Sequence, residues 1–107
     1  MRGGASVADP FCYRLFHYES DVLLAICDSS VLGKTFEEGD LQISVTGTFY
    51  HEKTCDEKAA VRLFKSATII NAVGRDIISL LAEHGYVEEE NVLSIKGIPH
   101  AQVVTIS

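Results

Sequence analysis

Residues 22–27 read VLLAIC, a run of strand length without a charged side chain. Such a nearly continuous apolar run is typical of a central strand that is covered on both faces of a sheet. Residues 11–18, FCYRLFHY, precede it and are rich in aromatic side chains, and residues 19–21, ESD, form a short turn between the two runs. We therefore expect a β-hairpin whose second strand lies in the interior of the sheet.

After this hairpin, residues 28–30 offer a cap for one short helical turn, and residues 34–40 are expected to be a loop. Residues 41–46, LQISVT, alternate apolar and polar side chains, which predicts a strand with one exposed face. Two further runs, residues 92–96 and 100–106, have strand character and are joined through Gly97, Ile98 and Pro99.

Helical spacing of apolar residues occupies the middle of the chain. Thr54 and Glu57 have the spacing of a capping box, which predicts a helix from there to about residue 67. A second helical segment is expected over residues 70–84, with Gly85 as its C-terminal cap. Whether the helix runs without a break between these two segments stays open, because the β-branched residues at 68–70 and Gly74 favour a break.

The resulting order is β-β-β-α-α-β-β. Strands that occur as hairpins around a central pair of helices favour an α+β fold with a largely antiparallel sheet of about five strands. At 107 residues the chain is expected to form one domain over residues 11–107, preceded by a flexible tail at residues 1–10. No apolar run approaches the ~20 residues of a membrane span, and the tail has no signal-peptide core, so we expect a cytoplasmic protein without a membrane partner.

The three cysteines, Cys12, Cys27 and Cys55, are an odd number without close spacing. This favours reduced thiols in a cytoplasmic protein over a disulfide framework. We expect Cys12 and Cys27 to be buried in strands, and Cys55 to be half-exposed in the first turn of a helix. A nucleophilic role for Cys55 would need His51 or His100 as a base, and the carboxylates of residues 56 and 57 oppose a thiolate.

The net charge of −6 comes from 15 acidic and 9 basic residues. Broad binding of naked nucleic acid needs a basic face, and here Lys58, Arg62 and Lys65 form the main basic cluster, on one predicted helix. We interpret that cluster as a solvated helix face paired with neighbouring acids. The acidity favours a basic protein or a ribonucleoprotein as partner, without direct binding of naked nucleic acid.

Two motifs fall short of a cofactor site. Gly33, Lys34 and Thr35 resemble the end of a phosphate-binding loop, but Asp28 occupies the position of its first glycine. His51 and Cys55 are four residues apart, yet His51 precedes the predicted helix, so the two do not share a helix face. We expect no metal and no cofactor.

A set of polar residues flanked by glycines is the candidate binding site. Glycines beside these residues would let the backbone approach a partner closely. Because side chains alternate along a strand, His100 and Gln102 are expected on the more open face, with Ala101 and Val103 buried on the other. Either the set converges into one polar pocket or each residue is solvated separately. The set comprises Gly33, Lys34, Thr35, Asn71, Arg75, His100 and Gln102.

Three stretches carry a resemblance to a known family: LGKTFEEG at 32–39, SATIINAVG at 66–74 and GIPHAQ at 97–102. From about residue 13 to residue 106 the chain resembles short archaeal proteins grouped as domain of unknown function 424. The resemblance implies an archaeal, cytoplasmic protein with a compact α+β fold. It implies no established activity, cofactor or catalytic residue, and it carries an association with the archaeal translation apparatus.

The leading hypothesis is a non-catalytic accessory binding module of an information-processing assembly, with translation as the first candidate. The alternative is a small enzyme or sensor that binds an anionic metabolite through Lys34, Arg75 and His100. A third hypothesis is a homodimer built on the edge strand predicted at residues 41–46.

Overall fold

The computed structural model describes residues 9–105 and contains a six-stranded sheet with strand order β6-β2-β3-β7-β9-β8. The strands are β2 (Phe11–Tyr18), β3 (Asp21–Asp28), β4 (Thr35–Glu38), β5 (Leu41–Ser44), β6 (Lys53–Cys55), β7 (Ile69–Val73), β8 (Leu93–Ile95) and β9 (Ile98–Val104). The helices are α1 (Gly47–Tyr50), α2 (Glu57–Ser66) and α3 (Arg75–Glu83), with 3-10 turns at Ser29–Val31 and Glu89–Asn91. The predicted flexible tail lies outside the described residues as far as residue 8.

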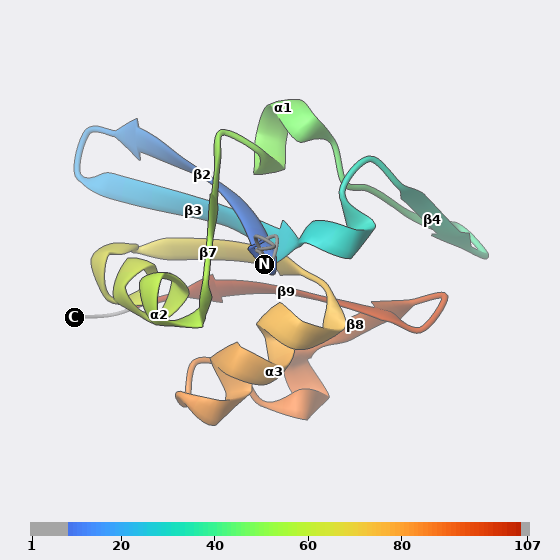
Figure 1. The fold of residues 1–107 in the computed structure, drawn as a ribbon. Coiled ribbons are helices and arrows are strands. Elements are labelled where there is room, and N and C mark those ends of the chain that lie inside the picture. Colours follow the sequence, from blue (N-terminus) through green and yellow to red (C-terminus); the bar gives the residue numbers. More distant parts are fainter. Residues whose placement is uncertain (1–8, 106–107) are drawn as a thin grey trace, which may run out of the picture.

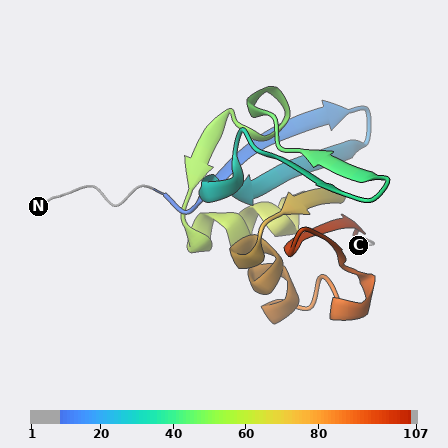
Figure 2. The same ribbon diagram turned by 90° about the vertical axis from the view of Figure 1, so that its right-hand side faces the viewer.

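The molecule has three layers. Helices α2 and α3 cover one face of the six-stranded sheet, and the two-stranded β4–β5 hairpin lies with α1 on the other (Figures 1 and 2). All neighbouring strands of the large sheet are antiparallel except β3 and β7, which are parallel. The predicted α+β class with a largely antiparallel sheet is therefore confirmed, although the number and order of strands differ from the expectation.

Strand β3 lies in the interior of the sheet, between β2 and β7, as its apolar run predicts. Its side chains alternate between two cores. Leu24 and Ile26 pack under the helices with Phe64 of α2, whereas Ala25 and Cys27 pack on the other face. These four residues of β3 are fully buried. Burial of a large aliphatic side chain such as Leu24 or Ile26 contributes about 1.5–3 kcal/mol.

The predicted helix over residues 70–84 is wrong at its start, because Ile69–Val73 form strand β7. The register Leu24↔Ile70 and Ala25↔Asn71 places this segment beside β3. Its β-branched residues suit a covered strand, and this tertiary pairing overrides the helical spacing of apolar residues. The break comes at Gly74, whose φ of 127° ends the strand, and helix α3 begins at Arg75.

Two smaller expectations also need correction. Residues 34–40 are not a loop, since Thr35–Glu38 form β4 and pair with β5 across a turn at Gly39, where φ is 61°. Helix α2 is capped by Asp56, whose Oδ1 accepts from the Ala59 amide at 2.9 Å, and Thr54 lies in strand β6 instead. These short strands carry little apolar periodicity of their own, so the sequence pattern does not reveal them.

The cysteines are buried, as expected for Cys12 and Cys27. Cys55 is buried too, in strand β6, so the prediction of a half-exposed helical residue is wrong. Burial raises the pKa of Cys27 to about 12 and that of Cys55 to about 11. Both thiols are therefore protonated at neutral pH, and a protonated thiol is a poor nucleophile.

Within residues 9–105, none of the helices has the length and hydropathy that a membrane crossing requires.

Candidate functional site

An open groove of about 370 Å³ lies on the sheet face that carries the β4–β5 hairpin. We call it the Asn71 groove. Strand β5 and helix α1 form one wall, β8 forms the other, and β7 and β9 supply the floor. The lining residues are Leu41, Gln42, Ile43, Ser44, Thr46, Phe49, Tyr50, Asn71, Leu93, Ile95 and His100.

The floor of the groove is a hydrogen-bonded group of three polar side chains. The Tyr50 hydroxyl donates to Asn71 Oδ1 at 2.8 Å, and His100 Nε2 lies 3.1 Å from the same oxygen. An amide oxygen only accepts, so His100 carries its ring proton on Nε2. The pairing of β7 with β9 explains the contact between Asn71 and His100, because the register Val73↔His100 and Asn71↔Gln102 places the two strands side by side.

This floor is uncharged at neutral pH. Burial lowers the pKa of His100 below its ordinary value, because removal from water disfavours the imidazolium ion. Burial also raises the pKa of Tyr50, so its hydroxyl keeps its proton. Within residues 9–105, neither Asn71 Nδ2 nor His100 Nδ1 has a hydrogen-bond partner. The floor thus retains an amide donor and a ring acceptor.

Hydrogen bonds close the base of the β4–β5 hairpin and tie its tip to the large sheet. Near its base, the Gly33 amide donates to the Val45 carbonyl at 2.7 Å, and the Val45 amide donates to the Lys34 carbonyl at 2.9 Å. Near its tip, Glu38 Oε1 accepts from the Lys96 amide at 2.6 Å. The wall of the groove is therefore tied to the turn between β8 and β9.

The groove has an apolar rim. Leu41 on β5 is 46% exposed and Leu93 on β8 is 44% exposed, and both line the same groove. Two large aliphatic side chains thus stay half in water at the rim of a polar floor.

The structure brings together part of the predicted site. Asn71 and His100 are hydrogen-bonded, and Gln102 stands opposite Asn71 in the register, exposed to solvent. As predicted, Ala101 is buried on the other face, whereas Val103 is partly buried there. His100 is half-buried and bonds to a side chain, which leaves a binding role open.

The remaining predicted residues lie elsewhere. Gly33, Lys34 and Thr35 belong to the base of the hairpin, where the Thr35 hydroxyl is 3.1 Å from that of Ser44. Arg75 begins helix α3 and its Nε donates to the Gly97 carbonyl at 3.3 Å, in a groove between α3 and β8. His100 lines the Asn71 groove, Arg75 lines the groove between α3 and β8, and Lys34 lines neither of these two grooves.

The sequence pattern misses the residues that complete the groove, above all Tyr50, Leu41 and Leu93. Tyr50 ends the one-turn helix α1, which no periodicity marks. Its phenol reaches Asn71 only because α1 folds back over the sheet. The placement of Leu41 and Leu93 along one groove is likewise a product of the tertiary fold, and no local signal predicts it.

One further polar group is buried in the sheet. Asp28 ends strand β3 and is 6% exposed. Its Oδ2 accepts from the Asp76 amide at 3.0 Å and its Oδ1 from the Ile77 amide at 2.8 Å. Residues 28–30 are expected to cap a short helical turn at residues 31–32, but the Asp28 side chain instead caps helix α3 across the fold.

Most of the chain matches a known protein family. A family model described as "Protein of unknown function (DUF424)" matches residues 16–106. The chain belongs to this family. The resemblance noted in the sequence is thus confirmed over most of the chain, and the family brings no assigned activity.

A solved structure gives the same fold. It is the crystal structure of an uncharacterized conserved protein from Methanopyrus kandleri, which superposes with a TM-score of 0.74 at 21% sequence identity. The match covers 91% of this chain and 94% of that one. No curated protein matches the sequence.

Proposed function

We propose that this member of the family is a non-catalytic accessory binding module that docks a protein or ribonucleoprotein partner through the Asn71 groove. The assembly we propose for it is the archaeal translation apparatus. The observation that carries the proposal is the uncharged, hydrogen-bonding floor of Asn71 and His100 between the exposed leucines Leu41 and Leu93.

The chemistry of the groove suits a segment of protein. Leu41 and Leu93 supply apolar contact at the rim, and the aromatic ring of Phe49 adds to one wall. Protein interfaces combine such apolar contact with a small number of placed polar groups. The amide of Asn71 donates and Nδ1 of His100 accepts, so the floor complements a peptide group or a side-chain amide, each of which carries both a donor and an acceptor.

The titratable groups favour binding over covalent chemistry. Burial keeps the thiols of Cys27 and Cys55 protonated, and His100 holds its Nε2 proton toward Asn71. The rival hypothesis of an enzyme or sensor for an anionic metabolite used Lys34, Arg75 and His100. His100 and Arg75 line different grooves and Lys34 lines neither, so the arrangement gives that hypothesis less support.

The charge of the chain agrees with a basic partner. A net charge of −6 repels naked RNA at long range and attracts basic proteins, among which the proteins of a ribonucleoprotein are a natural class. A cytoplasmic location is part of this proposal.

Co-sedimentation with archaeal ribosomes at moderate salt tests the proposal. We expect the wild-type protein to sediment with the ribosomal fraction, and Leu93→Ser to lose most of that binding, because it removes apolar contact from the rim. Tyr18→Ser is the matched control, since Tyr18 is 57% exposed at the β2–β3 turn, outside the groove. Migration of the wild type wholly as free protein would contradict the ribosomal partner, and equal loss in both variants would contradict the groove.

A further inference from the structure

Strand β9 has a free edge along its C-terminal half. On one side it pairs with the whole of β7, through residues His100 to Val104 in the register. On the other side β8 pairs with Ile98, Pro99 and His100 alone. Beyond His100 no described strand continues the sheet, so residues 101–104 end it.

The hydrogen-bonding direction of each residue on this edge follows from its neighbours. The Gly74 amide donates to the Pro99 carbonyl at 3.0 Å and the Thr105 amide donates to the Thr68 carbonyl at 2.8 Å, so the odd-numbered residues of β9 bond toward β7. Antiparallel pairing alternates, and the backbone groups of Gln102 and Val104 therefore point outward. Within residues 9–105, these outward N–H and C=O groups have no hydrogen-bond partner.

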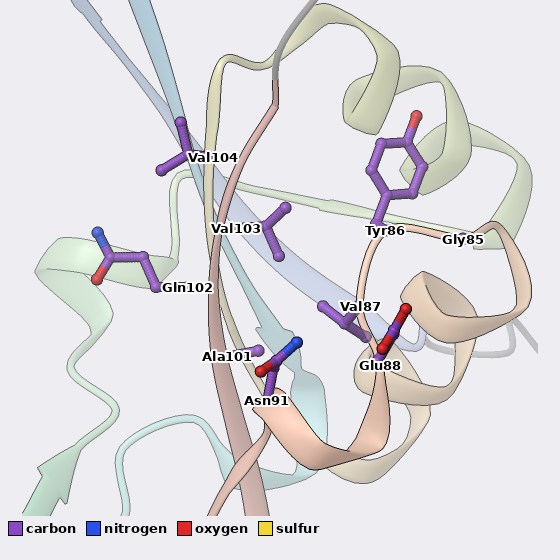
Figure 3. Close-up of a pocket in the computed structure, with 9 residues that line it drawn as sticks. All are labelled: Gly85, Tyr86, Val87, Glu88, Asn91, Ala101, Gln102, Val103 and Val104. Carbon is purple, nitrogen blue, oxygen red and sulfur yellow. The ribbon is translucent and has the colours of Figure 1, made fainter.

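A groove of about 550 Å³ runs along this edge, and we call it the edge groove. One side is strand β9, and the other is the segment that follows helix α3. Figure 3 shows Val103 pointing toward Tyr86, while Gln102 and Val104 point to the other side of the strand. The lining residues are Gly85, Tyr86, Val87, Glu88, Asn91, Ala101, Gln102, Val103 and Val104, and none of them lines the Asn71 groove.

We propose that the free edge of β9 binds an extended, positively charged peptide segment of a partner protein as an added strand of the sheet. Strand addition to a free edge is a recurrent mode of peptide recognition, in which main-chain hydrogen bonds supply affinity and alternate side chains supply specificity. Gln102 and Val104 provide the main-chain groups, and Tyr86 and Val87 provide an apolar wall for every second side chain of the peptide.

Charge identifies the peptide as basic. Glu88 is the charged residue among those that line the edge groove, and the exposed Glu89 and Glu90 follow it in the turn beside the groove. A lysine or arginine two positions from the apolar anchor of the peptide would lie on the same side of the added strand and reach Glu88. Val104, which is 67% exposed, offers apolar contact on the opposite side.

A second copy of this chain fits the edge less well. Each copy carries a net charge of −6, and pairing two β9 edges would bring two acidic turns toward one another. Like charges at an interface disfavour association. The basic peptide relieves the same acidic charge that a second copy would double.

Fluorescence anisotropy with a designed peptide tests this inference directly. The probe is a labelled nine-residue peptide that alternates valine with threonine and carries two lysines. A twin with glutamate for lysine tests charge, and a twin with N-methyl groups on alternate amides tests main-chain pairing. We expect saturable binding of the lysine peptide, at least about tenfold weaker binding of the N-methylated twin, and no binding of the glutamate twin.

Variants then locate the site. Val104→Pro removes the outward N–H without breaking a bond to β7, and we expect at least about tenfold weaker binding. Val104→Ala keeps the N–H and should retain most of the peptide binding. Glu88→Gln should weaken binding about threefold, whereas Glu37→Gln, an exposed change on β4, should not. Thermal unfolding of each variant confirms that it folds.

Equal binding of the N-methylated twin, or loss of binding in Val104→Ala equal to that in Val104→Pro, would overturn the inference. A dimeric mass by light scattering that Val104→Pro converts to a monomer would assign the edge to a second copy instead. His100→Ala should leave peptide binding unchanged, so failure here is distinguishable from failure of the Asn71 groove.

Discussion

Asp28 and Asn71 are both polar residues on central strands of the same sheet, yet their surroundings differ. Both carboxylate oxygens of Asp28 accept amides at the start of helix α3, and the side chain is sealed from water. The Asn71 side-chain oxygen accepts hydrogen bonds from Tyr50 and His100, and its amide nitrogen has no partner within residues 9–105. A polar group whose bonds are all satisfied inside the fold stabilises it, whereas one with a donor to spare at the floor of a groove is suited to a partner.

The largest loss of stability is expected from Gly74→Ala. Gly74 has φ 127° and ψ 151°, a region that is nearly exclusive to glycine, and a Cβ there would lie 2.3 Å from Asp28 Cγ. We expect a loss of at least about 3 kcal/mol in the free energy of unfolding, measured by denaturant titration. Gly47→Ala is the control, because a Cβ there meets nothing within 4 Å; similar losses in both would show that Asp28 is not the obstacle.

Asp28→Ala ranks second. It leaves the amides of Asp76 and Ile77 without their acceptor, and we expect a loss of about 2 kcal/mol in the same titration. Combined with Gly74→Ala, it also removes the atoms that the new Cβ would meet, so the double variant should lose clearly less than the sum of the single losses. Simple additivity would mean that the two sites do not interact in the way the contact implies.

His100→Ala is expected to cost under about 1 kcal/mol in stability, because His100 is only half-buried and makes one side-chain bond. Its main effect should be on binding at the Asn71 groove. His100→Gln, which keeps an amide donor near Asn71, is the matched variant and should retain more binding. A loss of stability as large as that of Asp28→Ala would place His100 with the structural groups.

The smallest expected effect is the dependence of the free energy of unfolding on pH. Its sign should be opposite for His100 and for Asp28. The pKa of His100 in the fold lies below its ordinary 6.5 because of burial. As the pH falls below about 6.5, the unfolded chain takes up the proton first, and stability drops until the pH passes the folded pKa. His100→Ala should abolish this slope in unfolding titrations.

Asp28 is the opposite case. Burial raises its pKa above the ordinary 3.8, although the Asp76 and Ile77 amides lower it. The folded state therefore takes up this proton first, so the contribution of Asp28 to stability increases as the pH falls through the folded pKa toward 3.8, and it is lost again as the pH rises. Asp28→Asn should remove this part of the pH profile, and an unchanged profile would contradict the assignment.

The sequence predicts the features that depend on local pattern. The run at residues 22–27 indicates the buried strand β3, and alternation after Pro99 places His100 apart from Ala101. It fails where tertiary pairing decides, as at Ile69–Val73, whose apolar spacing also fits a helix and which becomes β7 only beside β3. It also fails for elements too short to show a period, such as β4, β6 and α1.

The candidate site shows the same division. Asn71 and His100 stand out as polar residues beside Gly74 and Gly97 in the sequence, but their contact depends on the register of β7 with β9. Tyr50 and the exposed leucines reach the groove from α1, β5 and β8, and their convergence requires the complete fold. Arg75 looks like a member of the site in sequence, yet the turn at Gly74 sends it to the helical face.

The most direct test measures ribosome co-sedimentation and the free energy of unfolding together for wild type, His100→Ala and Asp28→Asn. We expect the wild type to sediment with archaeal ribosomes at moderate salt. We expect His100→Ala to stay within about 1 kcal/mol of wild-type stability while losing most of the bound fraction, and Asp28→Asn to lose more stability yet still bind wherever it is folded. A wild type that never sediments, or a His100→Ala variant that binds as the wild type does, would contradict the proposed role of the Asn71 groove.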